Sequence, residues 1–236
     1  MKKLLSVILA MAVMFAMGGC ESKEIEQVSD TVAGTTASVT ETTCHSAVED
    51  DSFVTIAGKE YSIDIVSLDL SNQNLSNEDI RDIGKFNSLE QLDLSGNNIT
   101  DISPLSAFSS YEHMIYLIDL SGNKIDDFKP LSDIKIQKLF LENSSGSNYE
   151  TIKGLNAGSI WLDGNDIENI EFLVGNSIST LFLNDNNISD WSPLLKIENL
   201  RWVYTFNNPI EIPDDKALYD EKEITLADSP QYAYPY

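Results

Sequence analysis

Four aromatic residues, Phe140, Trp161, Phe182 and Tyr204, recur at intervals of 21, 21 and 22 residues, and each directly follows an aliphatic residue. Aromatic rings bring a large contact area and a defined stacking geometry, so they often anchor the surfaces through which proteins bind other molecules. Their regular recurrence therefore indicates a candidate binding surface.

Residues suited to bond-making chemistry are sparse. The two histidines are His45, which follows Cys44, and His113, and neither has the spacing of a zinc site or of a catalytic nucleophile with its base. The runs 163–166 and 184–187 offer oxygen ligands of the kind that calcium prefers. Asp, Asn and Gly are also ordinary turn residues, which explains both runs without a metal. We therefore expect no catalytic residue, no metal site and no cofactor.

The charge of the chain excludes one class of partner. It has 15 Lys and Arg against 38 Asp and Glu, which gives a formal net charge of −23. A field of this sign repels the phosphates of nucleic acids. We therefore expect no nucleic-acid partner.

The aromatic residues belong to a longer repeat with the frame Leu-x-Leu-x-x-Asn-x-Ile. Its copies begin 24, 26, 21, 21, 21 and 22 residues apart. The seven starting residues are Leu68, Leu92, Ile118, Leu139, Ile160, Leu181 and Val203. A self-similar period in the twenties is typical of a solenoid, in which each repeat forms one coil.

The physical role of each frame position follows from its residue type. Leu-x-Leu predicts a short strand whose two aliphatic residues point inward and whose middle residue points outward. The Asn amide can bond backbone groups that the turn would otherwise bury unpaired. The return to the next strand is short and carries Pro at residues 104, 130 and 193, which favours 3₁₀ turns. In the longer first return, Ser76 to Ile83 predicts the start of an α-helix.

The returns Asp-Ile-Ser-Pro-Leu at 101–105 and Asp-Trp-Ser-Pro-Leu at 190–194 resemble the internalin-type leucine-rich repeats of bacterial surface proteins. The resemblance covers residues 65–212 and implies an α/β-type horseshoe solenoid of about seven repeats. Short parallel strands would line its concave face, and 3₁₀ or irregular returns its convex face. The resemblance also implies a non-enzymatic module that binds its partner through the concave face. The fourth copy departs from the pattern, because Ser144 stands at the Asn position.

The segments outside the repeats suggest where the protein acts. A basic head, an apolar run to Met17 and Gly18-Gly19-Cys20 resemble a bacterial lipoprotein signal over 1–19, with Cys20 acylated; a plain signal peptide is the alternative. We expect a disordered stalk at 20–52, a capping hairpin at 53–64 and a C-terminal cap or tail at 213–236. The expected location is the extracellular face of the bacterial cell membrane. The protein would contact this membrane only through its N-terminal lipid.

Our candidate ligand-binding residues include two that flank Tyr204 on the same side of the strand by period-two alternation. The set is Phe140, Trp161, Phe182, Trp202, Tyr204 and Phe206. The expected partner is an extracellular protein or peptide. A glycan partner, or a structural lipoprotein without a specific ligand, is the alternative. The aromatic column also has two purely structural interpretations: the stacked rings stabilise the sheet, or a C-terminal cap covers them.

Overall fold

The computed structural model describes residues 52–209 and 216–227, and of residues 216–218 only the backbone. The expected signal, the lipidation residue Cys20 and the Cys44-His45 pair lie outside the described residues, as does the Tyr-rich segment 228–236.

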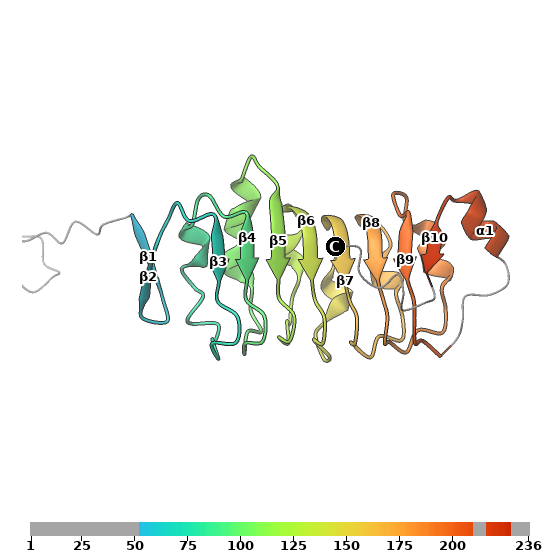
Figure 1. Cartoon of the computed structure of the whole chain (residues 1–236), viewed down its shortest axis with the longest axis horizontal. Coiled ribbons are helices and arrows are strands. Elements are labelled where there is room, and N and C mark those ends of the chain that lie inside the picture. The colour runs from blue at the N-terminus through green and yellow to red at the C-terminus, as the bar shows by residue number, and fades with distance from the viewer. Residues whose placement is uncertain (1–51, 210–215, 228–236) are drawn as a thin grey trace, which may run out of the picture. The chain divides into compact units, whose positions relative to one another are not determined.

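The repeats build one parallel sheet of eight strands, which we call the main sheet. Neighbouring strands in the sheet are also consecutive in the chain (Figure 1), so each coil packs only on the coils before and after it. The strands are β3 (Ser67–Asp69), β4 (Gln91–Asp93), β5 (Ile115–Asp119), β6 (Lys135–Phe140), β7 (Asn156–Trp161), β8 (Ser177–Phe182), β9 (Trp202–Tyr204) and β10 (Thr225–Ala227). The last strand extends the sheet beyond the seven copies of the frame.

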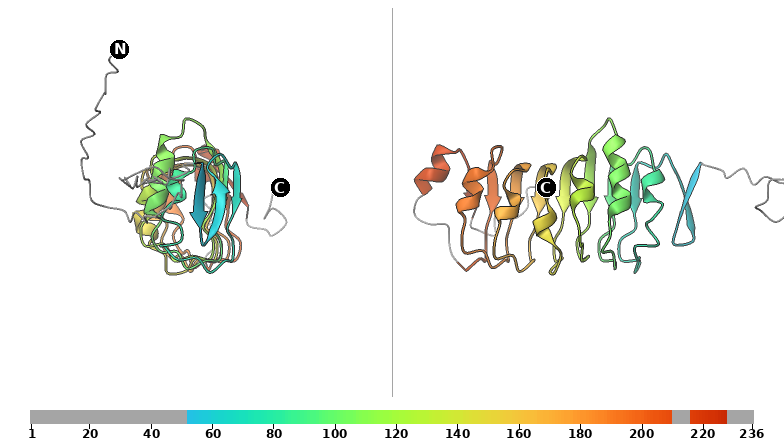
Figure 2. Two further views of the ribbon diagram at one scale, coloured as in Figure 1. Left: turned by 90° about the vertical axis from the view of Figure 1, so that its left-hand side faces the viewer. Right: turned by 180° about the vertical axis from the view of Figure 1, so that it is seen from behind.

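The returns lie on one side of the main sheet, as the view from behind shows (Figure 2). They contain six 3₁₀ helices: η1 (Ile83–Lys85), η2 (Ser103–Ser110), η3 (Lys129–Leu131), η4 (Tyr149–Thr151), η5 (Glu171–Leu173) and η6 (Ser192–Lys196). The 3₁₀ returns predicted from the short spacing are confirmed. We call the opposite side of the main sheet the outer face. It corresponds to the concave face that the sequence led us to expect.

The prediction of an α-helix in the first return is wrong. The backbone N–H groups of Ile83 and Lys85 donate to the carbonyls three residues earlier, over 3.0 Å each, which is the 3₁₀ pattern. The next return crowds this one, because a Cβ on Gly84 would lie 2.8 Å from the carbonyl oxygen of Pro104 and 2.9 Å from the Cβ of Ala107. There is no room here for the wider α-helix. Among the described residues, the α-helix is α1 (Lys216–Glu221), after the repeats.

The core lies between the main sheet and the returns. The aliphatic frame residues point into it, and Leu92, Leu94, Leu139 and Leu141 are fully buried. The antiparallel strands β1 (Phe53–Ile56) and β2 (Lys59–Ser62) precede the first coil, and Val54 and Ile56 join the same core. Burial of these side chains supplies the main stabilising free energy of the stack.

The frame Asn residues form a hydrogen-bonded ladder inside the stack. The Oδ1 of Asn97 accepts from the backbone N–H of Leu75, and its Nδ2 donates to the carbonyls of Leu70 and Leu94, all at 2.8–2.9 Å. Each such amide thus satisfies backbone groups of its own coil and of the preceding one. The other members are Asn123, Asn165, Asn186 and Asn208.

The irregular fourth copy keeps this backbone contact with a different residue. The hydroxyl of Ser144, at the Asn position, donates to the Glu142 carbonyl within its own turn and not to the preceding coil. Three residues later, the Oγ of Ser147 accepts from the backbone N–H of Ile125 at 2.9 Å. In the preceding copy the equivalent bond runs from the backbone N–H of Ile99 to the Oδ1 of Asn123, over 3.0 Å. Ser147 therefore supplies the acceptor that Ser144 cannot.

The residue before the Asn position of each frame copy has a left-handed backbone, with φ between 50° and 69°. Only Gly, Asn and Asp adopt this conformation readily, and only these types occupy the position. The column is Asn72, Gly96, Gly122, Asn143, Gly164, Asp185 and Asn207. Gly164 and Asp185, one residue from each of the runs 163–166 and 184–187, belong to this column.

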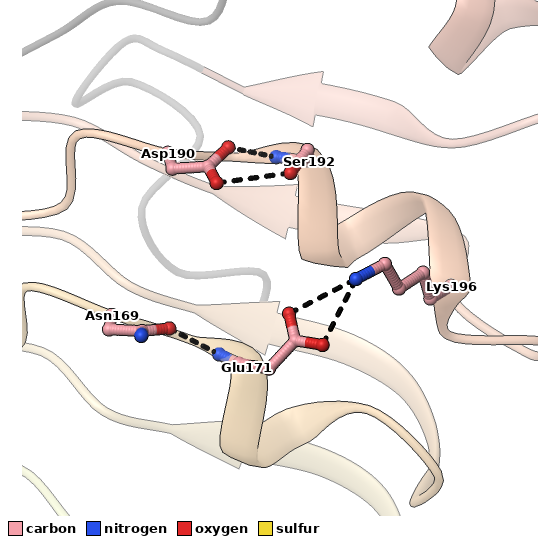
Figure 3. Close-up of polar contacts among 5 residues, drawn as sticks. All are labelled: Asn169, Glu171, Asp190, Ser192 and Lys196. Carbon is pink, nitrogen blue, oxygen red and sulfur yellow. Dashed lines mark hydrogen bonds and ion pairs between the residues drawn. The ribbon is translucent and has the colours of Figure 1, made fainter.

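A short polar contact starts several returns. The Oδ1 of Asp190 accepts from the backbone N–H of Ser192 at 2.9 Å, and Asn169 does the same for Glu171 at 2.7 Å (Figure 3). Between these two coils, Lys196 pairs with Glu171 over 3.0 Å (Figure 3). The Asp or Asn of the return thus fixes the turn into the 3₁₀ helix.

Candidate functional site

The four recurring aromatic residues lie in one row across the outer face. Phe140 pairs with Trp161, Trp161 with Phe182, and Phe182 with Tyr204 in the registers of β6 to β9. Their rings stack with centroids 4.2, 4.5 and 4.4 Å apart and interplanar angles of 17°, 7° and 4°. The predicted register is confirmed, and we call this row the aromatic ladder. Ala227 of β10 continues it beyond Tyr204.

The expectation that the whole ladder is exposed is wrong. Trp161, Phe182 and Tyr204 have only 8%, 1% and 7% of their surface exposed, and Phe140 is half-buried. Parallel stacking at one strand spacing covers both faces of each inner ring. By contrast, Trp202 and Phe206, the two residues that flank Tyr204, are 49% and 41% exposed. Of the six candidate residues, these two are therefore open to a partner.

A polar row runs beside the ladder, two residues further along each strand. Asp163 follows Trp161 there, and Asn184 follows Phe182; both are buried. The backbone N–H of Asn184 donates to Oδ1 of Asp163 at 2.7 Å, and that of Phe206 donates to Oδ1 of Asn184 at 2.8 Å. The same bond is thus made by a neutral amide in one coil and by a carboxylate in the other.

The second oxygen of Asp163 is exceptional. Its Oδ2 is buried and has no hydrogen-bond partner among the described residues. Burial raises the pKa of Asp163 to about 6, against the lowering effect of its bonds from Asn184. Burial also raises the pKa of Glu142, in the preceding coil of the same row, to about 7, and the charges of Asp163 and Asp119 add to this shift. A buried carboxylate oxygen without a donor is costly, so this site is a candidate for an additional contact.

The acidic start of the ladder row has a structural explanation. Asp69, Asp93 and Asp119 precede Phe140 in register. Each accepts a bond of 2.8–2.9 Å from the backbone N–H of the Ser two residues later. These bonds hold the pKa of Asp69 below its usual value, whereas burial raises that of Asp119. The carboxylates therefore stabilise the turns that follow the strands.

A shallow hollow of about 240 Å³ lies at the start of β6, β7 and β8. Gln137, Gly158 and Ser179 are among its lining residues, and a Cβ on Gly158 would lie 2.8 Å from the Gln137 carbonyl oxygen. Met114, which is 49% exposed, also lines it. Trp202 pairs with Thr180, the residue after Ser179, but it is not itself among the residues that line the hollow. Sequence periodicity did not indicate this hollow.

Comparison with known proteins agrees with this geometry. The family model described as leucine-rich repeats, in two copies, matches residues 87–133. Together with the eight-stranded parallel sheet, this match decides the fold. The chain is a leucine-rich repeat solenoid. No curated protein sequence matches it at a significant level.

Two internalins of Listeria monocytogenes are among the solved structures that resemble the solenoid. An internalin named inlF is 22% identical, with 72% of this chain and 57% of that protein covered and a TM-score of 0.47. Internalin C2 is 24% identical, with 72% and 86% covered and a TM-score of 0.45. The chain thus spans little more than half the length of the first of these proteins.

The described part of the solenoid contains no group of three or more His, Cys, Asp or Glu residues placed to hold a metal ion. Nor does any helix within residues 52–209 and 216–227 have the length and apolar character needed to cross a membrane.

We expect the solenoid to lose stability as the pH rises from about 4 to 8. The raised pKa values of Glu142 and Asp163 mean that the folded chain binds protons more tightly than the unfolded chain does. Folding therefore takes up protons in this range, and the free energy of unfolding falls as both groups ionise, by on the order of a few kcal/mol once solvent screening of the partly exposed Glu142 is allowed for. Urea unfolding at a series of pH values measures this.

Asp163→Asn isolates one contribution, because its amide oxygen can still accept from Asn184. This variant should flatten the pH profile and be more stable than the parent chain at pH 8. Asp133→Asn, which removes the same charge from an exposed return residue, should leave the slope between pH 4 and 8 unchanged. Parallel profiles for Asp163→Asn and the parent chain would rule out this origin of the slope.

Proposed function

We propose that this solenoid is a non-enzymatic binding module that recognises an extracellular protein or peptide through its outer face. The observation that carries the proposal is the exposure of Trp202 and Phe206, at 49% and 41%, on either side of Tyr204. Large aromatic side chains are seldom left exposed in pairs, and they often anchor interfaces. Internalin-like repeats support the same class of function.

The hollow at the start of β6, β7 and β8 offers a second contact area. Met114 lines it together with Gly158, which lies close to the Gln137 backbone, and with the polar residues Gln137 and Ser179. An extended peptide fits such a strip, because its backbone can bond the polar lining while one apolar side chain packs on Trp202. A protein or peptide partner therefore suits this surface better than a small molecule does.

The experiment is a binding screen followed by paired substitutions. The chain is presented on a sensor to extracellular protein fragments and, separately, to glycans. For a ligand found in this way, Trp202→Ser combined with Phe206→Ser should raise the Kd about 10- to 100-fold, which corresponds to about 1.4–2.8 kcal/mol. The matched control is Phe53→Ser, which removes a side chain that is 51% exposed from the hairpin before the repeats.

The outcomes separate the candidates. A protein fragment that loses affinity with the double variant but not with the control supports the proposal. Binding confined to glycans would assign the surface to a carbohydrate instead. An affinity that the double variant leaves unchanged, with the melting temperature also unchanged, would exclude this part of the outer face as the contact.

We further propose that acylation of Cys20 tethers the module to the extracellular face of the bacterial cell membrane. The support is the sequence around Gly18-Gly19-Cys20. An attached acyl chain would anchor the module because it contributes about 0.8 kcal/mol per buried CH₂. Labelling cells with a tagged palmitate should mark the parent chain and not Cys20→Ala. Equal labelling of both would exclude Cys20 as the anchor.

A further inference from the structure

The parts of β6 to β9 that precede the aromatic ladder have an unusual balance of charge. They hold three Lys or Arg and no Asp or Glu, although the whole chain has 15 of the first kind and 38 of the second. The segments are 135–139, 156–160, 177–181 and 199–203. Their cations are Lys135, Lys138 and Arg201, and we call this part of the outer face the basic strip. On the other side of the ladder, the polar row carries the acids Glu142 and Asp163.

The cations of the basic strip are not neutralised by the protein itself. Within residues 52–209 and 216–227, none of the three forms an ion pair with an acidic side chain. The Nζ of Lys138 lies 5.1 Å from the centroid of the Tyr116 ring, a contact that positions the ammonium and leaves its charge. Arg201 is exposed, and its Nη1 donates to the carbonyl of Leu200 at 3.0 Å. The other N–H groups of its guanidinium can bond an anionic partner.

The surface between Lys138 and Arg201 is low. The residues that β7 and β8 contribute there have short side chains; they are Gly158, Ser159, Ser179 and Thr180. The hollow described above opens at two of these positions. A peptide backbone that crosses the strands can therefore approach the sheet closely between the two cations.

The strand spacing fixes the separation of the two cations. Lys138 lies on β6 and Arg201 directly before β9, which is three strand intervals away, or about 14 Å. In an extended peptide, side chains on one face recur at every second residue, so residues four apart are separated by about 13 Å. Two carboxylates at this spacing would reach both cations together. Exposed apolar residues lie at either end of the path, Met114 and Tyr116 near β5 and Trp202 on β9.

We propose that the partner of this module presents an acidic peptide segment, bound in extended conformation across β6 to β9 with carboxylates at positions i and i+4 facing Lys138 and Arg201. This inference rests on the proposed function, to which it adds the charge and the spacing of the ligand. The acids of the polar row repel such a peptide, which confines it to the basic strip. A glycan that bears carboxylates would also suit the cations, but the exposed side chain of Met114 favours an aliphatic partner group, which sugars lack.

Selection of a random peptide library against the whole chain tests the inference. Bound peptides should show pairs of Asp or Glu four residues apart at least threefold more often than pairs three or five apart. For a selected peptide, Lys138→Gln combined with Arg201→Gln should raise the Kd at least tenfold, because both ion pairs are lost. Arg201→Gln alone, at an exposed position, should raise it at least threefold and serves in case the double variant fails to fold. Lys153→Gln removes an exposed cation from a return and should change the Kd less than twofold.

Charge reversal gives a second measurement. A chain with Lys138→Glu and Arg201→Glu should select peptides that carry Lys or Arg at the same spacing. Selected peptides without acidic pairs, whose affinity nevertheless falls with Trp202→Ser and Phe206→Ser, would overturn this inference and leave the proposed function intact. A library without any binder would also overturn it, while the screen against folded protein fragments still tests the module. Binding of polygalacturonate but of no peptide, abolished by Lys138→Gln with Arg201→Gln, would assign the basic strip to an anionic glycan instead.

Discussion

Asn186→Ala is expected to lower the free energy of unfolding by about 3–5 kcal/mol. The side chain is 4% exposed, and its Oδ1 accepts from the backbone N–H groups of Asn165 and Ile167 at 3.1 and 3.0 Å. Its Nδ2 donates to the carbonyls of Leu162 and Leu183 at 2.9 and 3.1 Å. An alanine leaves these groups buried without partners, and each such group costs about 1–3 kcal/mol.

Urea unfolding followed by circular dichroism measures the loss. The matched control is Asn199→Ala, because Asn199 is exposed and its amide bonds only the hydroxyl of Ser177 at 3.2 Å; its effect should stay within about 0.5 kcal/mol. If Asn186→Ala were as mild as the control, the Asn ladder would not hold the coils together. Water would then have to satisfy the freed backbone groups.

The coil architecture could be predicted from the sequence because the spacing of residues within each repeat determines the strand and the length of the return. Leucines two residues apart can be buried together only on one side of a strand, and a period of 21–26 residues leaves room only for a short return. The register of Phe140, Trp161, Phe182 and Tyr204 follows from the same count. These features depend on local spacing, so a single sequence contains them.

The α-helix expected after Ser76 failed because its cause is not local. Ser76 and Asp79 do bond each other, as a helix start would require. What prevents the helix is the contact of Gly84 with Pro104 and Ala107 of the next return. Helix propensity depends on the residues of one coil only, whereas this contact lies between two coils.

The low exposure of the aromatic ladder could not be predicted from the sequence for a related reason. Alternation places Trp161 and Phe182 on the outer face but says nothing of what lies above that face. The unpartnered Oδ2 of Asp163 was also hidden, although one signal existed: an Asp stands at 163 where the next coil has Asn184. Compensation of Ser144 by Ser147 needed the structure as well, since the two residues act on different coils.

Phe182→Ala is expected to cost about 3–5 kcal/mol, a loss similar to that of Asn186→Ala. Phe182 is 1% exposed and stacks between Trp161 and Tyr204 at 4.5 and 4.4 Å. Truncation removes its buried apolar area and leaves a gap between two rigid rings that the fixed strand spacing cannot close. Urea unfolding gives the size of the loss.

The control for this variant is Phe53→Ala, which truncates the same side chain where it is 51% exposed, and it should cost under about 1 kcal/mol. Fluorescence of Trp161 adds a second measurement, because loss of its stacking partner should shift its emission to the red. A small stability loss with an unshifted emission would mean that the ladder rings are not packed in solution. That result would return Trp161 and Phe182 to the set of residues available to a partner, and the contact surface would then extend from Trp202 across β7 and β8.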